Sequence, residues 1–231
     1  MSEKKEVDIA NLRKSYHSTT DVLLESSLTS KEPFAIFQQW LQLAVSTDGV
    51  EEPNAMCIAT VNKEGRPSAR MVLMKGYDQN GFRFFTNQRS RKGQDMSENP
   101  NVALVFFWEQ LSRSVRVEGQ VEMIPDKDVD DYYAQRPRSS QIAAHVSQNQ
   151  SAPIKDRDVL KDRFVMLEEK YKEVEKIERP EFWRGYNVRP DKIEFWQGQS
   201  TRMHDRIVFS KEGGEGWNVG ENGWNYQRLE P

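Results

Sequence analysis

The sequence predicts an antiparallel β-barrel with peripheral helices, a mainly β arrangement of the α+β class. Strand-like runs occur before and after the helical segments, and the early runs are separated by the turn sequences Lys63–Pro67 and Asp78–Gly81, not by the helical crossovers that parallel strands need. The chain has 231 residues, 36% of them hydrophobic, enough for one sizeable core. We therefore expect a single domain over residues 31–231, preceded by a polar, mobile arm over residues 1–30.

The spacing of apolar residues predicts each element in turn. After Pro33, a favoured first helical residue, Phe34, Phe37, Leu41 and Val45 recur at helical spacing. The run 114–123 alternates strictly between polar and apolar residues, as a half-buried strand does, whereas the run 102–108 is almost wholly apolar. Strands are expected over 56–62, 68–75, 82–86, 102–108, 114–123, 182–188, 193–197 and 206–210, and further helices over 126–135, 139–147 and 158–176.

Composition excludes several classes of protein. A net charge of −3 gives no broad field to attract nucleic acid or an anionic membrane, so any phosphate must be bound by local clusters of cations. Cys57 is the only cysteine, which excludes an intrachain disulfide, and the three scattered histidines suggest no metal site. No apolar run approaches the ~20 residues that span a bilayer, and the N-terminus lacks the apolar core of a signal peptide. We expect a cytoplasmic protein without a metal.

The first candidate site is a strand with a cation at each end, Arg70 and Lys75. Extended geometry places the two charges roughly 17 Å apart, on opposite faces unless the strand bends. They could serve two anionic groups. Taken alone, they are more simply explained as the solvated ends of a core strand.

The second candidate is a basic helix start. Thr86, Asn87 and Ser90 are all suitable N-caps, which places Arg91 and Lys92 in the first helical turn, where the helix dipole disfavours cations by roughly 0.3–1 kcal/mol. A bound phosphate would relieve that cost. A solvated basic face is the alternative.

The third candidate combines Tyr132, Arg136 and Ser140. Tyr132 and Arg136 lie one helical turn apart, and Ser140 falls near the expected start of the next helix, so the three could clamp a phosphate. The alternative is a stacked Tyr–Arg pair on an exposed helix.

The fourth candidate follows an aromatic strand that ends near Trp196. Arg202 and His204 alternate as residues of a strand do, so both can point into one cavity, and Arg206 shares that parity. A lone histidine is more often structural, but three basic residues on one face favour a binding site. Asp205 has the opposite parity and is expected to be a structural partner.

These motifs, in their order, resemble the pyridoxine (pyridoxamine) 5'-phosphate oxidases, flavoenzymes that make pyridoxal 5'-phosphate. The segment EFWQGxxxRxHDR at 194–206 carries the resemblance most strongly. It is joined by RxxY at 13–16, RxVLxK at 70–75, YTxxxSRK at 85–92 with Phe85 for the usual Tyr, YxxxRPxxSQ at 132–141 and WxxxRLxP at 224–231. The likeness covers the chain from about Ile9 onward.

The resemblance implies an FMN-binding split barrel of antiparallel Greek-key type. It implies a homodimer with FMN at the subunit interface and pyridoxine or pyridoxamine 5'-phosphate as substrate. Hydride would pass from the substrate's C4' carbon to flavin N5, and O2 would reoxidise the flavin to give H2O2.

The resemblance also assigns site residues. Those expected to bind the cofactor are Arg70, Met71, Val72, Leu73, Met74, Lys75, Phe85, Thr86, Arg91, Lys92, Gln150, Ser151, Trp196 and Arg206. Those expected to bind the substrate are Arg13, Tyr16, Lys75, Tyr132, Arg136, Ser140, Arg202 and His204, of which Arg202 and His204 are the candidate catalytic residues. Arg13 and Tyr16 would belong to a lid over the substrate.

The chain departs from the family pattern at two places, and two other functions stay open. Ser114 stands where the family usually has a flavin-contacting Gln, and Gln150–Ser151 match the family's Gln-Ser pair only with a one-residue insertion. A flavin carrier or sensor on the same fold would need only the FMN residues. A flavin reductase that uses a nicotinamide cofactor is also possible, since the absence of GxGxxG is weak evidence against it. The joint presence of the substrate residues favours the oxidase.

Overall fold

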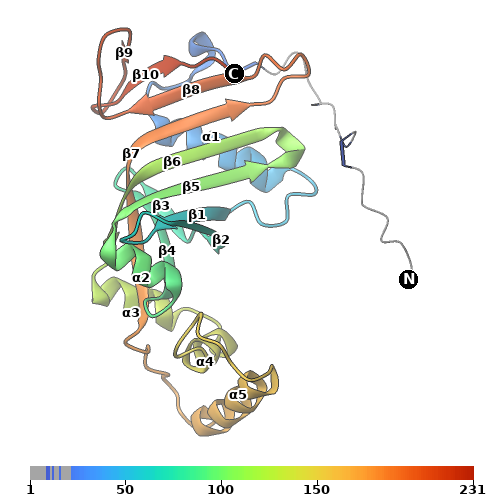
Figure 1. Ribbon diagram of the computed structural model, residues 1–231, viewed down its shortest axis with the longest axis vertical. Helices are drawn as coiled ribbons and strands as arrows, with labels where there is room; N and C mark the ends of the chain where they lie inside the picture. Colours follow the sequence, from blue (N-terminus) through green and yellow to red (C-terminus); the bar gives the residue numbers. More distant parts are fainter. Residues whose placement is uncertain (1–8, 11, 13–15, 17–21) are drawn as a thin grey trace.

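The computed structural model describes residues 9, 10, 12, 16 and 22–231, and its centre is one ten-stranded antiparallel sheet (Figure 1). The hydrogen-bonded path runs β2-β1-β5-β6-β7-β8-β10-β9, with β3 paired to β4 and β4 paired to β7. The strands are β1 (Ala55–Val61), β2 (Pro67–Leu73), β3 (Gly76–Asp78), β4 (Gly81–Asn87), β5 (Asn101–Trp108), β6 (Arg113–Met123), β7 (Trp183–Gln197), β8 (Asp205–Ser210), β9 (Asn218–Val219) and β10 (Asn225–Arg228).

The long strand β7 divides the sheet into a barrel and an extension. One edge of β7 pairs with β6 along most of its length, while the other edge pairs with β4 over 183–188 and with β8 over 192–197. Just after β2, the Lys75 N–H donates to the Arg83 carbonyl at 2.8 Å, which extends the β3–β4 pairing by one residue toward β2. Strands β8, β10 and β9 continue outward from the second half of β7.

Two of the helices that flank the barrel position the candidate sites. The helices are α1 (Pro33–Ser46), α2 (Arg91–Glu98), α3 (Asp126–Ala134), α4 (Arg138–Val146) and α5 (Asp158–Tyr171), with short 3-10 turns η1 (Glu25–Ser27) and η2 (Glu109–Leu111). Helix α1 packs on the barrel core, where the Phe37 ring meets Phe82 and Phe106 at centroid distances of 5.0 and 5.1 Å. Helices α2 and α3 lie at the end of the barrel opposite the β8–β10 extension (Figure 1).

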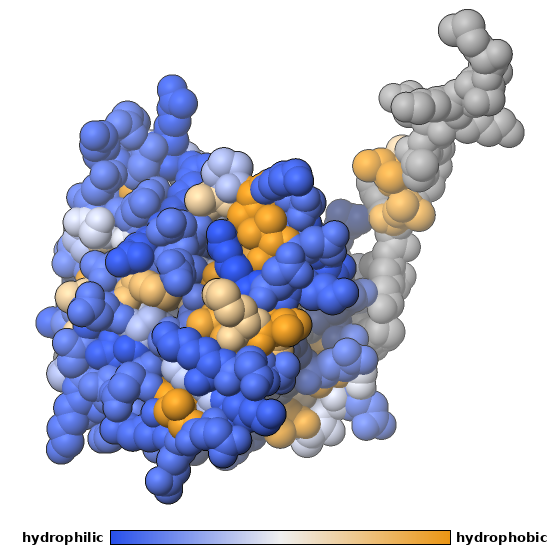
Figure 2. Space-filling model, turned by 90° about the horizontal axis from the view of Figure 1, so that it is seen from below, coloured by the Kyte–Doolittle hydropathy of each residue, from blue (hydrophilic) through white to orange (hydrophobic). Residues whose placement is uncertain are grey.

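Helices α4 and α5 project from the lower end of the barrel and share a small core of their own (Figure 1). Its buried residues are Ile142, Val146, Leu167 and Ile177. Seen from this end, the surface is mostly hydrophilic with separate apolar patches (Figure 2). Helix α5 ends at Tyr171, short of the predicted Lys176, because the chain turns there and Arg138 donates to the carbonyls of Tyr171 and, at 2.9 Å, Val174.

The structure confirms the predicted class, an antiparallel barrel with peripheral helices. Two predicted strands, 182–188 and 193–197, form the single strand β7. The polar residues between them did not break the strand, because the partner strand β6 shifts register at Glu118–Gly119 and absorbs the irregularity. A Cβ on Gly119 would lie 2.0 Å from the Arg189 carbonyl oxygen, so this crossing needs glycine. Within the described residues, no helix is both long and apolar enough to cross a membrane.

Candidate active site

A cluster of cations surrounds the N-terminus of α2. Ser90 caps the helix, its hydroxyl accepting from the Gly93 N–H, and Arg91 and Lys92 occupy the first turn as predicted. The Lys92 ammonium donates to Thr86 Oγ1 at 3.3 Å and to Ser90 Oγ at 3.2 Å. Burial, and then the charge of Arg70, lower the pKa of Lys92. The protein thus holds two cations close together at a helix N-terminus, an arrangement that a bound phosphate would stabilise.

Arg70 is held in this cluster by two residues that sequence reasoning did not single out. Its Nη1 donates to Thr60 Oγ1 at 2.6 Å, and Thr60 donates in turn to the buried carboxylate of Asp95 at 2.6 Å. Asp95 also lies 3.8 Å from Arg70 and 4.0 Å from Arg91. The one available signal was the i,i+4 spacing of Arg91 and Asp95 on α2. Asp95 carries one negative charge, whereas Arg70, Arg91 and Lys92 carry three positive charges, so the cluster keeps a net positive charge.

Gln150 and Ser151 come to the same place. The Arg91 N–H donates to Ser151 Oγ at 3.3 Å, and Ser151 adopts a left-handed conformation with φ of 76°. Arg91, Gln150 and Ser151 line one hollow, together with Arg89, Gln94, Asn149 and Ala152. Gln150 and Ser151, which match the family pattern only with an insertion, therefore lie beside the first turn of α2.

The predicted cofactor run bends before it ends. Strand β2 stops at Leu73, and the next two N–H groups bond to different partners, Met74 to the Asn54 carbonyl and Lys75 to the Arg83 carbonyl. Strand parity therefore does not extend to Lys75. Met74 is buried in the core, while Met71 is 64% exposed on the outside of the barrel. Val72 packs partly against the core.

The phosphate clamp predicted from Tyr132 and Arg136 is built on an aromatic stack. The Tyr132 ring lies 4.0 Å from the Phe85 ring at an interplanar angle of 11°, and Phe85 stacks in turn on Trp183 at 5.1 Å and 6°. The Arg136 guanidinium lies 4.7 Å from the centroid of the Trp183 ring. Phe85, which lacks the family hydroxyl, therefore supports Tyr132 through its ring.

Arg136 has unused hydrogen-bonding capacity. Within the described residues its Nη1 is buried without a hydrogen-bond partner, and burial lowers the pKa of the guanidinium. A buried donor of this kind is costly unless a ligand satisfies it. Gln141, not predicted as a site residue, fixes the segment by donating to the Arg136 carbonyl at 3.1 Å. Ser140 is half-buried in the first turn of α4.

A third group lies at the turn between β7 and β8. The His204 ring is 4.9 Å from Trp196 and 5.3 Å from Tyr16, and Tyr16 is 5.7 Å from Trp196. The Gln199 N–H donates to His204 Nδ1 at 3.0 Å. Burial, and then the charge of Arg202, lower the pKa of His204. Both effects favour the neutral imidazole.

The prediction that Arg202 and His204 alternate as in a strand is wrong. Strand β8 begins only at Asp205. Arg202 lies in a turn with φ of 64°, its N–H bonded to the Gln199 carbonyl at 3.0 Å, and its side chain is exposed. The turn after Gly198 thus replaces the expected extension. His204 and Arg202 remain neighbours through this turn.

Arg206 is engaged in a buried ion pair. Its Nε lies 2.8 Å from the Glu194 carboxylate, which Arg116 also contacts. Burial alone would raise the pKa of Glu194, but the hydrogen bonds from Arg206 and Arg116 outweigh it and lower the pKa. Arg206 and Trp196 line a shallow hollow on the outer face of the sheet; its other lining residues are Val105, Phe107, Ser114, Arg116, Glu194 and Pro231.

A single chain does not bring all the predicted residues together. The α2 cluster and the Tyr132–Arg136 clamp each contact the end of β4, the cluster at Thr86 and the clamp at Phe85. The β7–β8 turn lies at the other end of the molecule (Figure 1). Arg13 lies outside the described residues.

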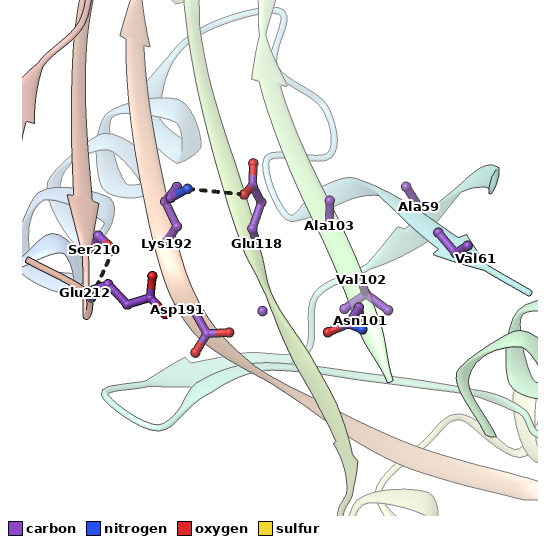
Figure 3. Close-up of a pocket in the computed structure, with 11 residues that line it drawn as sticks. Ala59, Val61, Asn101, Val102, Ala103, Glu118, Asp191, Lys192, Ser210 and Glu212 are labelled. Carbon is purple, nitrogen blue, oxygen red and sulfur yellow. Dashed lines mark hydrogen bonds and ion pairs between the residues drawn. The ribbon is translucent and has the colours of Figure 1, made fainter. Parts of the chain in front are cut away.

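Another hollow crosses the outer face of β1, β5, β6, β7 and β8 (Figure 3). Glu118 and Lys192 point toward each other across it and lie 3.8 Å apart. None of the predicted site residues lines this hollow.

Comparison with known proteins assigns the family. Residues 46–171 match the family model described as pyridoxamine 5'-phosphate oxidase, and residues 183–231 match the model described as the pyridoxine 5'-phosphate oxidase C-terminal dimerisation region. The chain belongs to the pyridoxamine 5'-phosphate oxidase family. A relative from Bombyx mori named pyridoxine/pyridoxamine 5'-phosphate oxidase is 48% identical, over 97% of this chain and 90% of its own length. A pyridoxine-5'-phosphate oxidase from Bos taurus is 45% identical, over 97% of this chain and 88% of its own length.

Two solved structures share the fold. PhzG from Burkholderia lata 383, in complex with tetrahydrophenazine-1-carboxylic acid, superposes with a TM-score of 0.79 at 25% identity, over 93% of this chain and 100% of that chain. A pyridoxamine 5'-phosphate oxidase-related, FMN binding protein from Nostoc punctiforme PCC 73102 superposes with a TM-score of 0.63 at 15% identity, over 85% of this chain and 96% of that chain. The predicted split-barrel fold and the predicted family are confirmed.

Proposed function

We propose that this protein is an FMN-dependent pyridoxine/pyridoxamine 5'-phosphate oxidase that uses O2 and releases pyridoxal 5'-phosphate and H2O2. Its relatives of that name match nearly the whole chain. The observation that carries the proposal is the pair of adjoining cationic sites, one at α2 and one at Arg136. An oxidase of this kind needs two phosphate sites, one for FMN and one for the vitamer.

The residues at α2 fit the FMN phosphate. Arg70, Arg91 and Lys92 supply the charge, and Ser151 lies beside the first turn of the helix. The lowered pKa of Lys92 indicates that its positive charge lacks compensation, which a phosphate dianion would provide. When bound, FMN supplies the hydride acceptor.

The substrate residues divide into a clamp and a ring-binding group. Arg136, with Tyr132, Ser140 and Lys75, would bind the vitamer phosphate, and its buried Nη1 offers a donor for it. Arg202 and His204 would orient the pyridine ring. Because His204 Nδ1 accepts from the Gln199 N–H, neutral His204 carries its proton on Nε2 and can donate from there to a substrate oxygen.

We propose that each active site is completed by a second copy of the chain. The matched C-terminal region is described as a dimerisation region, and the clamp and the β7–β8 turn lie at different ends of one chain. Exposed apolar side chains on the outside of the barrel, Met71 at 64% and Phe107 at 59%, suit burial in such an interface. The α2 cluster and clamp of one subunit would then face Trp196, Arg202 and His204 of the other.

The flavin carrier and the flavin reductase have less support. A carrier or sensor has no use for the unsatisfied donor of Arg136 or for the His204–Tyr16–Trp196 group.

The test is direct. Purified protein is mixed with FMN and pyridoxamine 5'-phosphate in air, and the aldehyde chromophore and peroxide are followed. We expect both products in equal amounts and bound FMN at one per subunit. Stoichiometric FMN without product formation would favour the carrier, and flavin reduction by a nicotinamide cofactor alone would favour the reductase.

A further inference from the structure

Asp205 is a buried carboxylate that joins three separate segments. It is 9% exposed. Its Oδ2 accepts from the backbone N–H of Leu23 at 3.1 Å and from the side-chain amide of Gln199 at 2.9 Å, and its Oδ1 accepts from Arg228 at 2.7 Å. One side chain thus ties the base of the N-terminal arm, the β7–β8 turn and the C-terminal tail together.

Arg228 strengthens the connection to the arm. Its Nη2 donates to the Leu23 carbonyl at 2.6 Å and to Glu25 at 2.9 Å, and its Nε donates to the other oxygen of Glu25 at 3.0 Å. The arm is therefore clasped at Leu23–Glu25 by Asp205 and Arg228. Charge-assisted hydrogen bonds of this number favour one arrangement of the three segments.

The Gln199 end of the network reaches His204. While the Gln199 amide is held by Asp205, the Gln199 N–H donates to His204 Nδ1 and the Gln199 carbonyl accepts from the Arg202 N–H. Gln199 thus fixes the tautomer of His204 and the left-handed turn at Arg202, whose φ is 64°. Such a strained residue persists only where its surroundings over-determine it.

The arm and the turn meet again at the aromatic group. Tyr16 packs edge-on against both His204 and Trp196. A Cβ on Gly198 would lie 2.9 Å from Tyr16 Cδ1, so the arm fits tightly on this turn.

We propose that Asp205 is a positioning residue for the oxidase reaction: its carboxylate holds the Gln199–His204 turn and the base of the N-terminal arm as one unit, so that His204 keeps a single tautomer against Tyr16. The proposal rests on the proposed function for its catalytic consequence, but not for its structural part. Asp205 acts through Gln199 and His204 and does not itself touch the substrate.

The test uses the FMN-loaded, full-length protein with Asp205→Asn and, as a matched control, Asp191→Asn, which alters an exposed acid on β7. The asparagine side chain would place an N–H donor against Leu23, Gln199 or Arg228, all of which donate hydrogen bonds to Asp205. Two quantities are measured: the anaerobic rate of FMN reduction by pyridoxamine 5'-phosphate, and the tautomer of His204 from nitrogen-15 NMR of labelled histidine. The NMR measurement does not require the protein to convert substrate.

We expect D205N to retain FMN, to reduce it about tenfold or more slowly, and to lose the Nε2-protonated signature of His204, while D191N matches the parent. A D205N protein with the parental signature overturns the proposal, whatever its rate. If D205N does not fold, Gln199→Leu, which removes the same link and leaves Asp205 its other partners, decides by the same signature. If the parent fails to reduce FMN, the proposed function fails, and the NMR result still decides the role of Asp205.

Discussion

At the residue scale, the buried Nη1 of Arg136, which has no hydrogen-bond partner among the described residues, is the clearest sign that the site takes a ligand. Arg136→Ala should weaken binding of phosphorylated vitamers and leave FMN nearly unaffected, because the FMN phosphate is assigned to other cations. Loss of one charge-assisted contact costs roughly 1.5–3 kcal/mol, which is about one to two decades in kcat/KM. Steady-state kinetics and FMN titration measure the two effects, with the exposed Arg163→Ala as control. A variant that loses FMN instead would show that the clamp serves the cofactor.

Arg202 tests the other half of the site. A guanidinium can hold a planar ring through several donors in a fixed fork, which the ammonium of lysine cannot do. Arg202→Lys should bind FMN normally and lose more than tenfold in kcat/KM, or above ~1.4 kcal/mol of transition-state stabilisation. Anaerobic stopped-flow reduction of bound FMN isolates this step. A parental rate of reduction would assign Arg202 a structural role only.

Residue types and spacing predicted local features of the candidate sites better than they predicted the contacts that hold the side chains. The Ser90 cap and the first-turn cations follow from local rules and appear as expected. The contacts that hold these side chains were not predicted. Thr60 on β1 and Asp95 on α2 contact Arg70, and Trp183 on β7 contacts Arg136. Such contacts depend on tertiary packing between segments far apart in sequence, which periodicity does not encode.

At the element scale, β7 and β8 are joined by the Glu194–Arg206 pair, which makes their stability depend on pH. The pKa of Glu194 is lowered in the folded protein. The pair therefore stabilises the protein above the unfolded-state pKa near 4.5, and this contribution is lost as the pH falls through the lower, folded-state value.

Glu194→Gln should therefore lower the free energy of unfolding at pH 7 by about 1–3 kcal/mol, because Arg206 and Arg116 lose a charged acceptor. The deficit should shrink as the pH falls below about 4.5 and through the lower folded-state pKa, where the carboxylate of the folded parent becomes protonated. Urea unfolding of both proteins at several pH values gives the comparison. Glu168→Gln, on the exposed face of α5, controls for loss of charge. A deficit that is the same at every pH would mean that packing, not the ion pair, is affected.

The longer strands were predicted to within one or two residues at their ends, whereas the short strands β3, β9 and β10 and the turn between β7 and β8 were not predicted. Alternation of polar and apolar residues locates β6, and a continuous apolar run locates β5. The segment after Gly198 has no such alternation to follow. Its turn depends on hydrogen bonds from Gln199 to His204 and Arg202. Parity extrapolated from β8 therefore failed at Arg202, three residues before the strand begins.

At the scale of the whole molecule, the two groups of candidate site residues are separated within one chain, and we therefore propose that a second chain completes each site. The α2 cluster with its clamp lies at one end of the barrel, and the turn that carries Arg202 and His204 lies at the other (Figure 1). A symmetric dimer could bring each half-site against its complement twice. Sequence reasoning from one chain predicts the residues of both half-sites, and the proposed dimer would bring the two half-sites together.

Mixing two inactive variants tests this arrangement. Arg91→Glu damages the half-site at α2 by replacing a phosphate-binding cation with an anion, and Arg202→Ala damages the half-site at the β7–β8 turn. In a dimer with shared sites, a mixed pair has one site with both defects and one site with none. Random reassociation of equal amounts should therefore restore about a quarter of the parental sites, because half of the dimers are mixed and each has one intact site of two. The two variants are unfolded together, refolded with FMN, and assayed beside each variant treated alone. Should the mixture be no more active than its components, although size and mass measurements show mixed dimers, each chain would have to carry a complete site of its own.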